Sequence, residues 1–258
     1  MRRSQPILRA ARQAGFTLIE LMVAIAIALF LLAAVLNVYL NMKSTFNAQD
    51  DLAQLQDSQR LALTMLTTTI QSTGYYVDPV VNTRASELPQ VPVVTRADGS
   101  SYAFAPAQGI VGTGDGSGTG VLSDTVTVRY QRANGDGLLN CQGVGNTAGA
   151  VGSVAVTVNT FRVNANNELT CTLDDGTGAG APVALASNVK SFSVMYGVDT
   201  DGDAKRAVDT YMPASGITAA LWSNVYTARV TLEFIRKKVD GSAGSVKVVQ
   251  VINLMNIK

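Results

Sequence analysis

The hydrophobic positions of this chain form one long run near the N-terminus and many short runs after it. All sixteen residues from position 21 to position 36 are apolar, and apolar residues continue on both sides across residues 16–40. That length matches the roughly 20 residues that a helix needs to cross a bilayer. Residues 16–40 are therefore expected to form a transmembrane helix.

Residues 41–73 are more polar but keep a helical pattern. Apolar residues recur there at near-helical spacing, at Phe46, Leu52, Leu55, Ala62, Leu66 and Ile70. The helix is expected to continue to Thr73 and to end at Gly74, since glycine readily takes the left-handed conformation at a helix end. The alternative is a separate amphipathic coiled-coil stalk over residues 42–70, but sustained heptads with charged flanks are missing.

Residues 74–258 change to prolines, glycines and short β-branched runs, which indicates a mostly β globular head. The segment 79–120 is expected to be rich in loops. Expected strands are 125–132, 154–158, 169–173, 189–196, 226–236 and 246–252. The fold class is therefore α+β, with a long N-terminal helix followed by a β-rich head.

The charges are unevenly placed along the chain. Arg2, Arg3, Arg9 and Arg12 precede the apolar run with no acidic residue among them, and the next arginine is Arg60. The positive-inside rule places this short leader in the cytoplasm and the bulk of the chain across the inner membrane. Without residues 1–15, 16 basic residues remain against 19 acidic ones, a net charge of −3. No nucleic-acid partner is expected for such a chain.

The composition excludes several kinds of catalytic site. The chain has no histidine and two cysteines, which removes Ser-His-Asp, Cys-His and His-ligated zinc sites. The glycine-rich stretch at 112–120, GTGDGSGTG, is not a phosphate-binding loop, because no lysine and no helix follow it. A flexible surface loop is the preferred interpretation.

The stretch GFTLIEL at 15–21 places a glycine directly before the apolar run and an acid, Glu20, inside it. An ordinary secretory signal peptide would carry an A-x-A cleavage site after its apolar region, and that site is missing. An uncleaved signal anchor is the other simple interpretation. Neither interpretation explains the glycine or the acid.

This stretch resembles the class III leader of type IV pilins and type II secretion pseudopilins. The resemblance implies that a prepilin peptidase removes residues 1–15 by cutting between Gly15 and Phe16, and methylates the new amino group of Phe16. Glycine suits the cut because it lets an extended backbone lie close in a protease cleft. The resemblance also implies that Glu20 pairs with the N-terminal amine of a neighbouring subunit. The alternative is that Glu20 simply reaches water at the membrane interface.

Along most of its length the chain resembles a PilW-type minor pilin. This resemblance rests on weaker features than the leader motif, namely the size of the chain, its cysteine pair, and the stretches VMYGVDTDGD at 194–203 and LWSNVYTARVTLEF at 221–234. The resemblance implies an antiparallel pilin-like head and a non-enzymatic protein that primes and caps the type IV pilus fibre. Its implied partners are other minor pilins, the major pilin and a tip adhesin. Its implied location is the inner membrane, with a periplasmic head, and then the pilus tip.

One departure from the family pattern and two alternatives remain. Major pilins typically have a proline about two-thirds along this helix, whereas this chain has Asn37 there. Helix melting at a proline during assembly is therefore not implied.

A type II secretion pseudopilin of the J type and a ligand-binding adhesin anchored by the same helix are the alternative functions.

Cys141 and Cys171 lie on the periplasmic side in this topology, where thiols oxidise. A disulfide between them is expected, and two buried reduced cysteines are the alternative. Closing a loop of about 31 residues would stabilise the head by roughly 3.5 kcal/mol in the chain-entropy model.

Asp199, Asp201 and Asp203 alternate in the stretch DTDGD, and Asp209 follows six residues later. Their oxygens are ligands of the kind that calcium prefers. An EF-hand would need a glycine at Ala204 and a bidentate acid at Thr210, and both are missing. An exposed turn that leads to a short strand near Tyr211 is therefore preferred over a calcium site.

Overall fold

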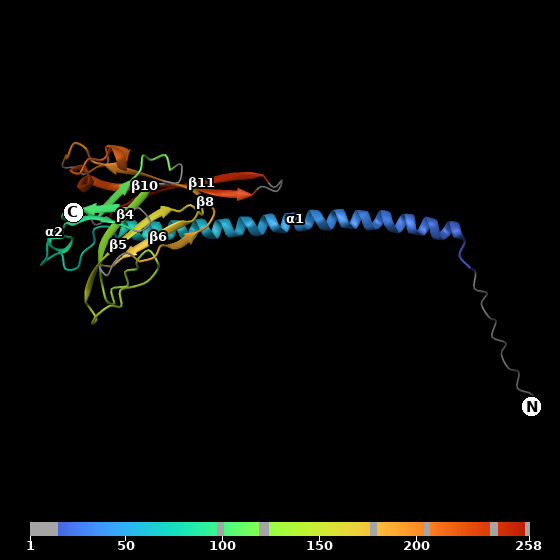
Figure 1. Cartoon of the computed structure of the whole chain (residues 1–258), viewed down its shortest axis with the longest axis horizontal. Coiled ribbons are helices and arrows are strands. Elements are labelled where there is room, and N and C mark those ends of the chain that lie inside the picture. The colour runs from blue at the N-terminus through green and yellow to red at the C-terminus, as the bar shows by residue number, and fades with distance from the viewer. Residues whose placement is uncertain are drawn as a thin grey trace, which may run out of the picture. The chain divides into compact units, whose positions relative to one another are not determined.

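The computed structural model describes residues 15–96, 101–118, 124–175, 180–203, 207–237 and 242–255. The chain divides into two compact units, residues 1–49 and residues 50–258. Helix α1 (Leu18–Gln71) runs through the first unit and supplies the first element of the second (Figure 1). Residues 50–258 are called the head unit below.

Helix α1 begins and ends within two residues of the bounds expected from the sequence. It contains neither glycine nor proline. After Gln71 a turn leads to Gly74, whose φ of 73° lies in the left-handed region, as expected for a helix end. The backbone N–H of Gly74 donates to the carbonyl oxygen of Arg129 at 2.9 Å, which ties the end of the helix to a central strand.

The head unit contains two larger antiparallel sheets (Figure 1). The first has the order β3-β4-β5-β6-β7, and its strands are β3 (Ile110–Thr113), β4 (Thr125–Ala133), β5 (Val154–Val163), β6 (Leu169–Asp174) and β7 (Val183–Ala186). The second has the order β11-β10-β8-β9, and its strands are β8 (Val189–Val198), β9 (Thr210–Pro213), β10 (Val225–Lys237) and β11 (Ala243–Asn253). All six strands expected from the sequence are present, and so is the short strand expected near Tyr211.

The segment 79–120 contains more regular structure than the sequence suggested. It holds helix α2 (Arg84–Glu87), strands β1 (Val91–Thr95) and β2 (Ser101–Phe104), which pair with each other, and strand β3. These elements have only four or five residues each, and Pro92 interrupts β1. Short strands that contain proline show little alternation, so sequence patterns do not detect them. Two 3-10 helices, η1 (Ala214–Gly216) and η2 (Leu221–Asn224), follow β9.

The larger of two hydrophobic clusters joins the last turns of α1 to both larger sheets. Its fully buried members include Leu66 and Ile70 of α1, Val128 and Phe161 of the five-stranded sheet, and Phe192 of the four-stranded sheet. On α1 the buried positions Ala62, Leu66 and Ile70 recur every four residues, so one face of the helix lies in the core. From Ala62 onward, the apolar positions of the pattern in residues 41–73 are therefore the ones that pack into the core of the head unit.

Arg129 on β4 is fully buried and fixes the irregular segment before it. Its guanidinium group donates four hydrogen bonds of 2.5–3.1 Å to backbone carbonyl oxygens, those of Leu88, Pro89, Ala105 and Gln108. Burial lowers the pKa of Arg129 to about 10, so the side chain is still charged at neutral pH. A buried charge is tolerated here because every bond that it makes satisfies a carbonyl outside the sheets.

The described part of the glycine-rich stretch, residues 112–118, packs against the four-stranded sheet and is not a loose loop. Gly112 lies in β3, where an added Cβ would overlap the hydroxyl of Tyr196 and come within 2.7 Å of the Thr125 carbonyl oxygen. An added Cβ on Gly118 would come within 2.8 Å of the Phe192 carbonyl oxygen. The glycines at these two positions are explained by close approach of the backbone, which the sequence alone did not reveal.

We expect Gly112→Ala to lower the free energy of unfolding by about 1–3 kcal/mol, because the new methyl group must displace the buried Tyr196 ring. Urea unfolding of the purified protein would measure it. Gly145→Ala is the matched control, since its nearest atom is 4.0 Å away and its φ is outside the left-handed region. It should change stability by less than about 0.5 kcal/mol. Equal stability of the two variants would contradict the close packing at Gly112.

Candidate functional site

Gly15 and Phe16 precede α1 and are exposed, with 89% of Phe16 accessible. A Cβ added to Gly15 would meet no atom within 4 Å. The described structure therefore does not itself require glycine at position 15, and the requirement has to come from another molecule. Residues 1–14, with the four arginines of the expected leader, lie outside the described residues.

Thr17 and Glu20 form a capping box at the start of α1. The Thr17 N–H donates to Oε2 of Glu20 at 3.1 Å, and the Thr17 hydroxyl donates to the same oxygen at 3.0 Å. In return the Glu20 N–H donates to the Thr17 hydroxyl oxygen at 3.4 Å. Glu20 thus satisfies free donors of the first helical turn. Among the described residues no group donates to its other oxygen, Oε1.

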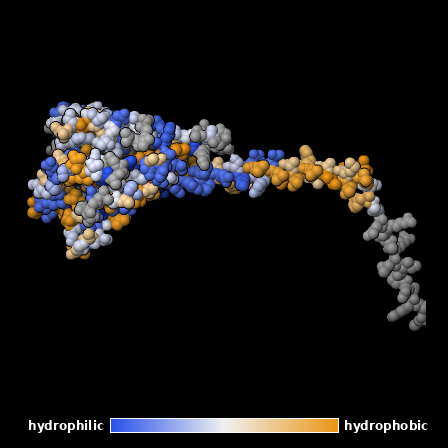
Figure 2. Space-filling model, in the orientation of Figure 1, coloured by the Kyte–Doolittle hydropathy of each residue, from blue (hydrophilic) through white to orange (hydrophobic). Residues whose placement is uncertain are grey.

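The part of α1 after Glu20 is suited to lipid. Helix α1 contains a stretch long and apolar enough to cross a membrane by length and composition, and hydrophobic side chains cover the visible face of its N-terminal part in Figure 2. The amide of Asn37 donates to the Ala33 carbonyl oxygen at 3.1 Å, so this polar group is satisfied within the helix. Asn37 therefore does not interrupt the helix as a proline would.

Cys141 and Cys171 form a disulfide, with Cα atoms 6.2 Å apart and both side chains fully buried. Cys171 lies in β6, and Cys141 lies in the connection between β4 and β5. The Cys141 N–H also donates to Oδ1 of Asn159 on β5 at 2.9 Å. The disulfide therefore holds a long connection onto the five-stranded sheet.

The aspartate-rich stretch connects β8 to β9. Carboxylate oxygens of Asp199, Asp201 and Asp209 lie within 4.8 Å of one another, whereas Asp203, which the sequence placed in the group, is not part of it. The carboxylates accept hydrogen bonds from their own loop. Gly202 N–H donates to Asp199 at 2.7 Å, and Thr200 N–H donates to Asp209 at 2.8 Å. Such bonds are typical of a turn.

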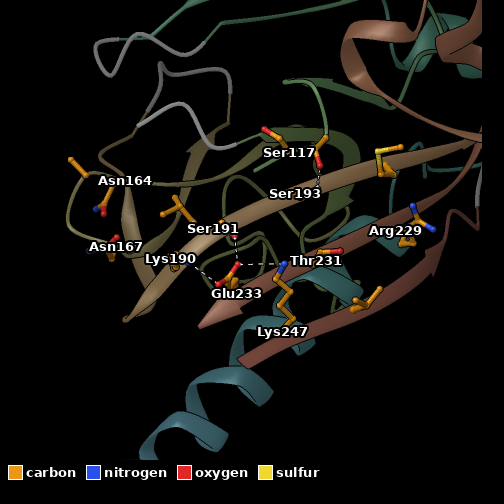
Figure 3. Close-up of a pocket in the computed structure, with 15 residues that line it drawn as sticks. Ser117, Asn164, Asn167, Lys190, Ser191, Ser193, Arg229, Thr231, Glu233 and Lys247 are labelled. Atoms are coloured by element: carbon orange, nitrogen blue, oxygen red, sulfur yellow. Dashed lines mark hydrogen bonds and ion pairs between the residues drawn. The ribbon is translucent and has the colours of Figure 1, made fainter. Parts of the chain in front are cut away.

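A groove of about 940 Å³ lies over the outward face of β8, β10 and β11 (Figure 3). The Nζ atom of Lys190 lies 2.9 Å from Oε1 of Glu233, and that of Lys247 lies 3.7 Å from Oε2. The hydrogen bond from Lys190 lowers the pKa of Glu233 below its usual value. The Arg229 guanidinium lies 4.9 Å above the ring of Tyr211. Among the described residues that line the groove, three are therefore basic and one is acidic.

The sequence did not reveal this groove. Alternation along β8 and β10 predicts which side chains point outward, but the walls come from distant segments. Ser117 and the turn that carries Asn164 and Asn167 border it. The tertiary fold brings these segments beside the sheet, and no local sequence pattern predicts that.

Two family models match the chain. The prokaryotic N-terminal methylation motif matches residues 10–36, and the model described as type IV pilus-assembly protein W, PilW, matches residues 153–251. Together these matches support a type IV pilin of the PilW type. The first match covers the capping box and its apolar helix, and the second covers the strands from β5 to most of β11.

The solved structures similar to this chain include a type IV-like pilin from Thermus thermophilus. That chain is 14% identical, with a TM-score of 0.42 over 79% of this chain and 98% of the other. The comparison with curated proteins found no match.

The methylation motif implies processing by a prepilin peptidase and assembly with other pilins. The apolar helix and the motif together fit a membrane-anchored pilin.

The turn interpretation of the aspartate stretch predicts that calcium does not change the stability of the head unit. A cation that binds only the folded state would raise the melting temperature by mass action. We expect the full-length protein to melt at the same temperature with excess calcium and with chelator, as measured by calorimetry. A rise with calcium that Asp199→Asn and Asp209→Asn abolish would support a calcium site instead.

Proposed function

We propose that this PilW-type pilin is a minor pilin that joins other minor pilins to prime fibre assembly and then caps the fibre at its tip. The observation that carries the proposal is the free Oε1 of Glu20 at the start of an apolar helix. A carboxylate in hydrocarbon is costly unless it is paired, so a single subunit leaves a charge that another molecule has to neutralise. The match to a pilus-assembly family supports this role.

The mature chain begins at Phe16 in this proposal, after the peptidase removes residues 1–15. Residues 16–40 form the transmembrane half of α1, residues 41–73 its periplasmic half, and residues 74–258 the periplasmic head. The methylated amine of Phe16 lies close in sequence to Glu20. In a stack of staggered subunits the amine of one subunit reaches the carboxylate of its neighbour, and the pair sets the register between helices.

The two alternatives differ in partner. A type II secretion pseudopilin of the J type has the same leader, and it would assemble with secretion pseudopilins and not with pilus subunits. An anchored adhesin would bind a receptor through its exposed loops. Crosslinking mass spectrometry on native membranes distinguishes the three functions by the proteins that it identifies.

Gly15→Leu should block processing, because the described structure leaves room for a side chain at Gly15 and only the peptidase cleft would exclude it. The intact mass of the membrane protein should then remain that of the 258-residue precursor. The variant should still fractionate with the membrane, since α1 is unchanged. Normal loss of fifteen residues would contradict the proposed cleavage site.

Glu20→Gln should weaken assembly without affecting processing. Glutamine keeps an oxygen that can accept from Thr17, so the capping box survives, but the charge that attracts an amine is lost. We expect recovery with other minor pilins to fall at least about fivefold, or about 1 kcal/mol. Asp50→Asn removes one charge from the same helix outside the transmembrane half and is the control. If Glu20 only reached water, both variants would assemble normally.

A further inference from the structure

Strand β11 forms a long, regular edge of the four-stranded sheet. Its eleven residues pair with β10 without a register shift, from Lys237 opposite Ala243 to Thr227 opposite Asn253. Among the described residues no strand pairs with its other side. Such an edge presents a row of backbone donors and acceptors to any extended chain.

One hydrogen bond beyond the strand shows which residues face the free edge. The Leu254 N–H donates to the Tyr226 carbonyl oxygen at 2.9 Å, and these two residues are directly opposite each other in the register. Antiparallel pairs alternate between bonded and non-bonded ones, so the even-numbered residues of β11 bond to β10. The odd-numbered residues therefore direct their N–H and C=O groups outward, namely Ser245, Lys247, Val249, Val251 and Asn253.

This edge has little of the protection that natural edges carry. Edge strands are commonly blocked by proline, bulges or several charges. From Ala243 to Asn253 there is no proline and no bulge, and Lys247 is the only charged residue. Val249 and Val251 are 56% and 47% exposed on the outward face. The Gln250 side chain contacts the Val251 carbonyl oxygen at 3.4 Å, a long bond that an incoming strand can replace.

The charges beside the edge favour an acidic partner. Lys190 and Lys247 share the single carboxylate of Glu233, and Arg229 has no carboxylate partner among the described residues. An antiparallel strand added to β11 would place its side chains opposite the odd-numbered residues on this same outward face (Figure 3). The matching segment has an acid opposite Lys247 and apolar residues opposite Val249 and Val251.

We propose that the free edge of β11 binds an extended acidic and apolar segment of another pilin subunit as an added strand. The binding of an extended segment as an added strand follows from the edge itself, while the identity of the partner as a pilin rests on the proposed function.

A pair of substitutions at one position tests strand addition. The N–H of Val249 faces outward, so Val249→Pro removes a donor from the free edge but none from the bonds to β10. Val249→Ala shortens the same side chain and keeps the N–H. Gln250→Pro removes an inward donor and should lower the melting temperature, whereas Val249→Pro should melt within a few degrees of Val249→Ala.

The binding probe is a fluorescent peptide, Thr-Thr-Val-Thr-Val-Thr-Glu-Thr-Thr, titrated against the full-length protein in detergent. Read antiparallel to β11, it places glutamate opposite Lys247 and valines opposite Val249 and Val251. We expect Val249→Pro to weaken binding about tenfold (about 1.4 kcal/mol) and Val249→Ala less than about threefold. A peptide with lysine in place of glutamate should bind more weakly to the wild type. Equal affinities of the proline and alanine variants would overturn strand addition.

Two further measurements keep the proposal testable if Val249→Pro folds poorly. Residue-resolved hydrogen exchange on the wild type should show the amides of Lys247, Val249 and Val251 becoming protected when the peptide binds, and unchanged exchange there would overturn strand addition. A photocrosslinker at Val251 in native membranes should capture another pilin. Crosslinks only to proteins that are not pilins, or peptide binding without a pilin crosslink, would overturn the partner assignment alone.

Discussion

The structure depends on one helix that has to be stable in two surroundings. The apolar side chains in the N-terminal part of α1 are exposed, while the part from Ala62 onward buries one face in the core of the head unit. A helix satisfies its own backbone hydrogen bonds, so it needs no water in hydrocarbon and no partner strand in the head. The absence of glycine and proline from Leu18 to Gln71 follows from this constraint.

The polar residues of α1 show how the constraint is met locally. The side-chain amide of Asn37 donates a hydrogen bond to a backbone carbonyl of the helix, and one carboxylate oxygen of Glu20 accepts hydrogen bonds from Thr17 at the first turn. At the other end, the N–H of Gly74 bonds to the carbonyl of Arg129, whose buried side chain holds the segment between α2 and β3. One residue of β4 therefore anchors both the end of the helix and the irregular chain that follows it.

Long periodic patterns were sufficient to predict α1, its end at Gly74 and the six main strands, because burial on one face leaves a regular trace in the sequence. Strands β1, β2, β3 and β7 are too short for such a trace. Closely packed glycines such as Gly112 look like flexible ones, because glycine serves both purposes. The grouping of Asp199 with Asp209 rather than with Asp203 depends on the path of the loop between β8 and β9. The groove that Arg229 lines depends on contacts between segments distant in sequence.

Among the described residues, Oε1 of Glu20 has no donor and the free edge of β11 has no partner strand, and the surroundings of each decide what it can do. Oε1 of Glu20 lies beside an apolar helix, where no water competes once the helix is in lipid, so a pairing partner there is close to obligatory. The outward N–H and C=O groups of β11 and the guanidinium of Arg229 lie on the exposed side of the head, where water can satisfy them. A partner at that edge has to displace water and gains little for each bond. Pairing at Glu20 is therefore suited to holding a subunit in an assembly, and strand addition at β11 is suited to selecting which neighbour it accepts.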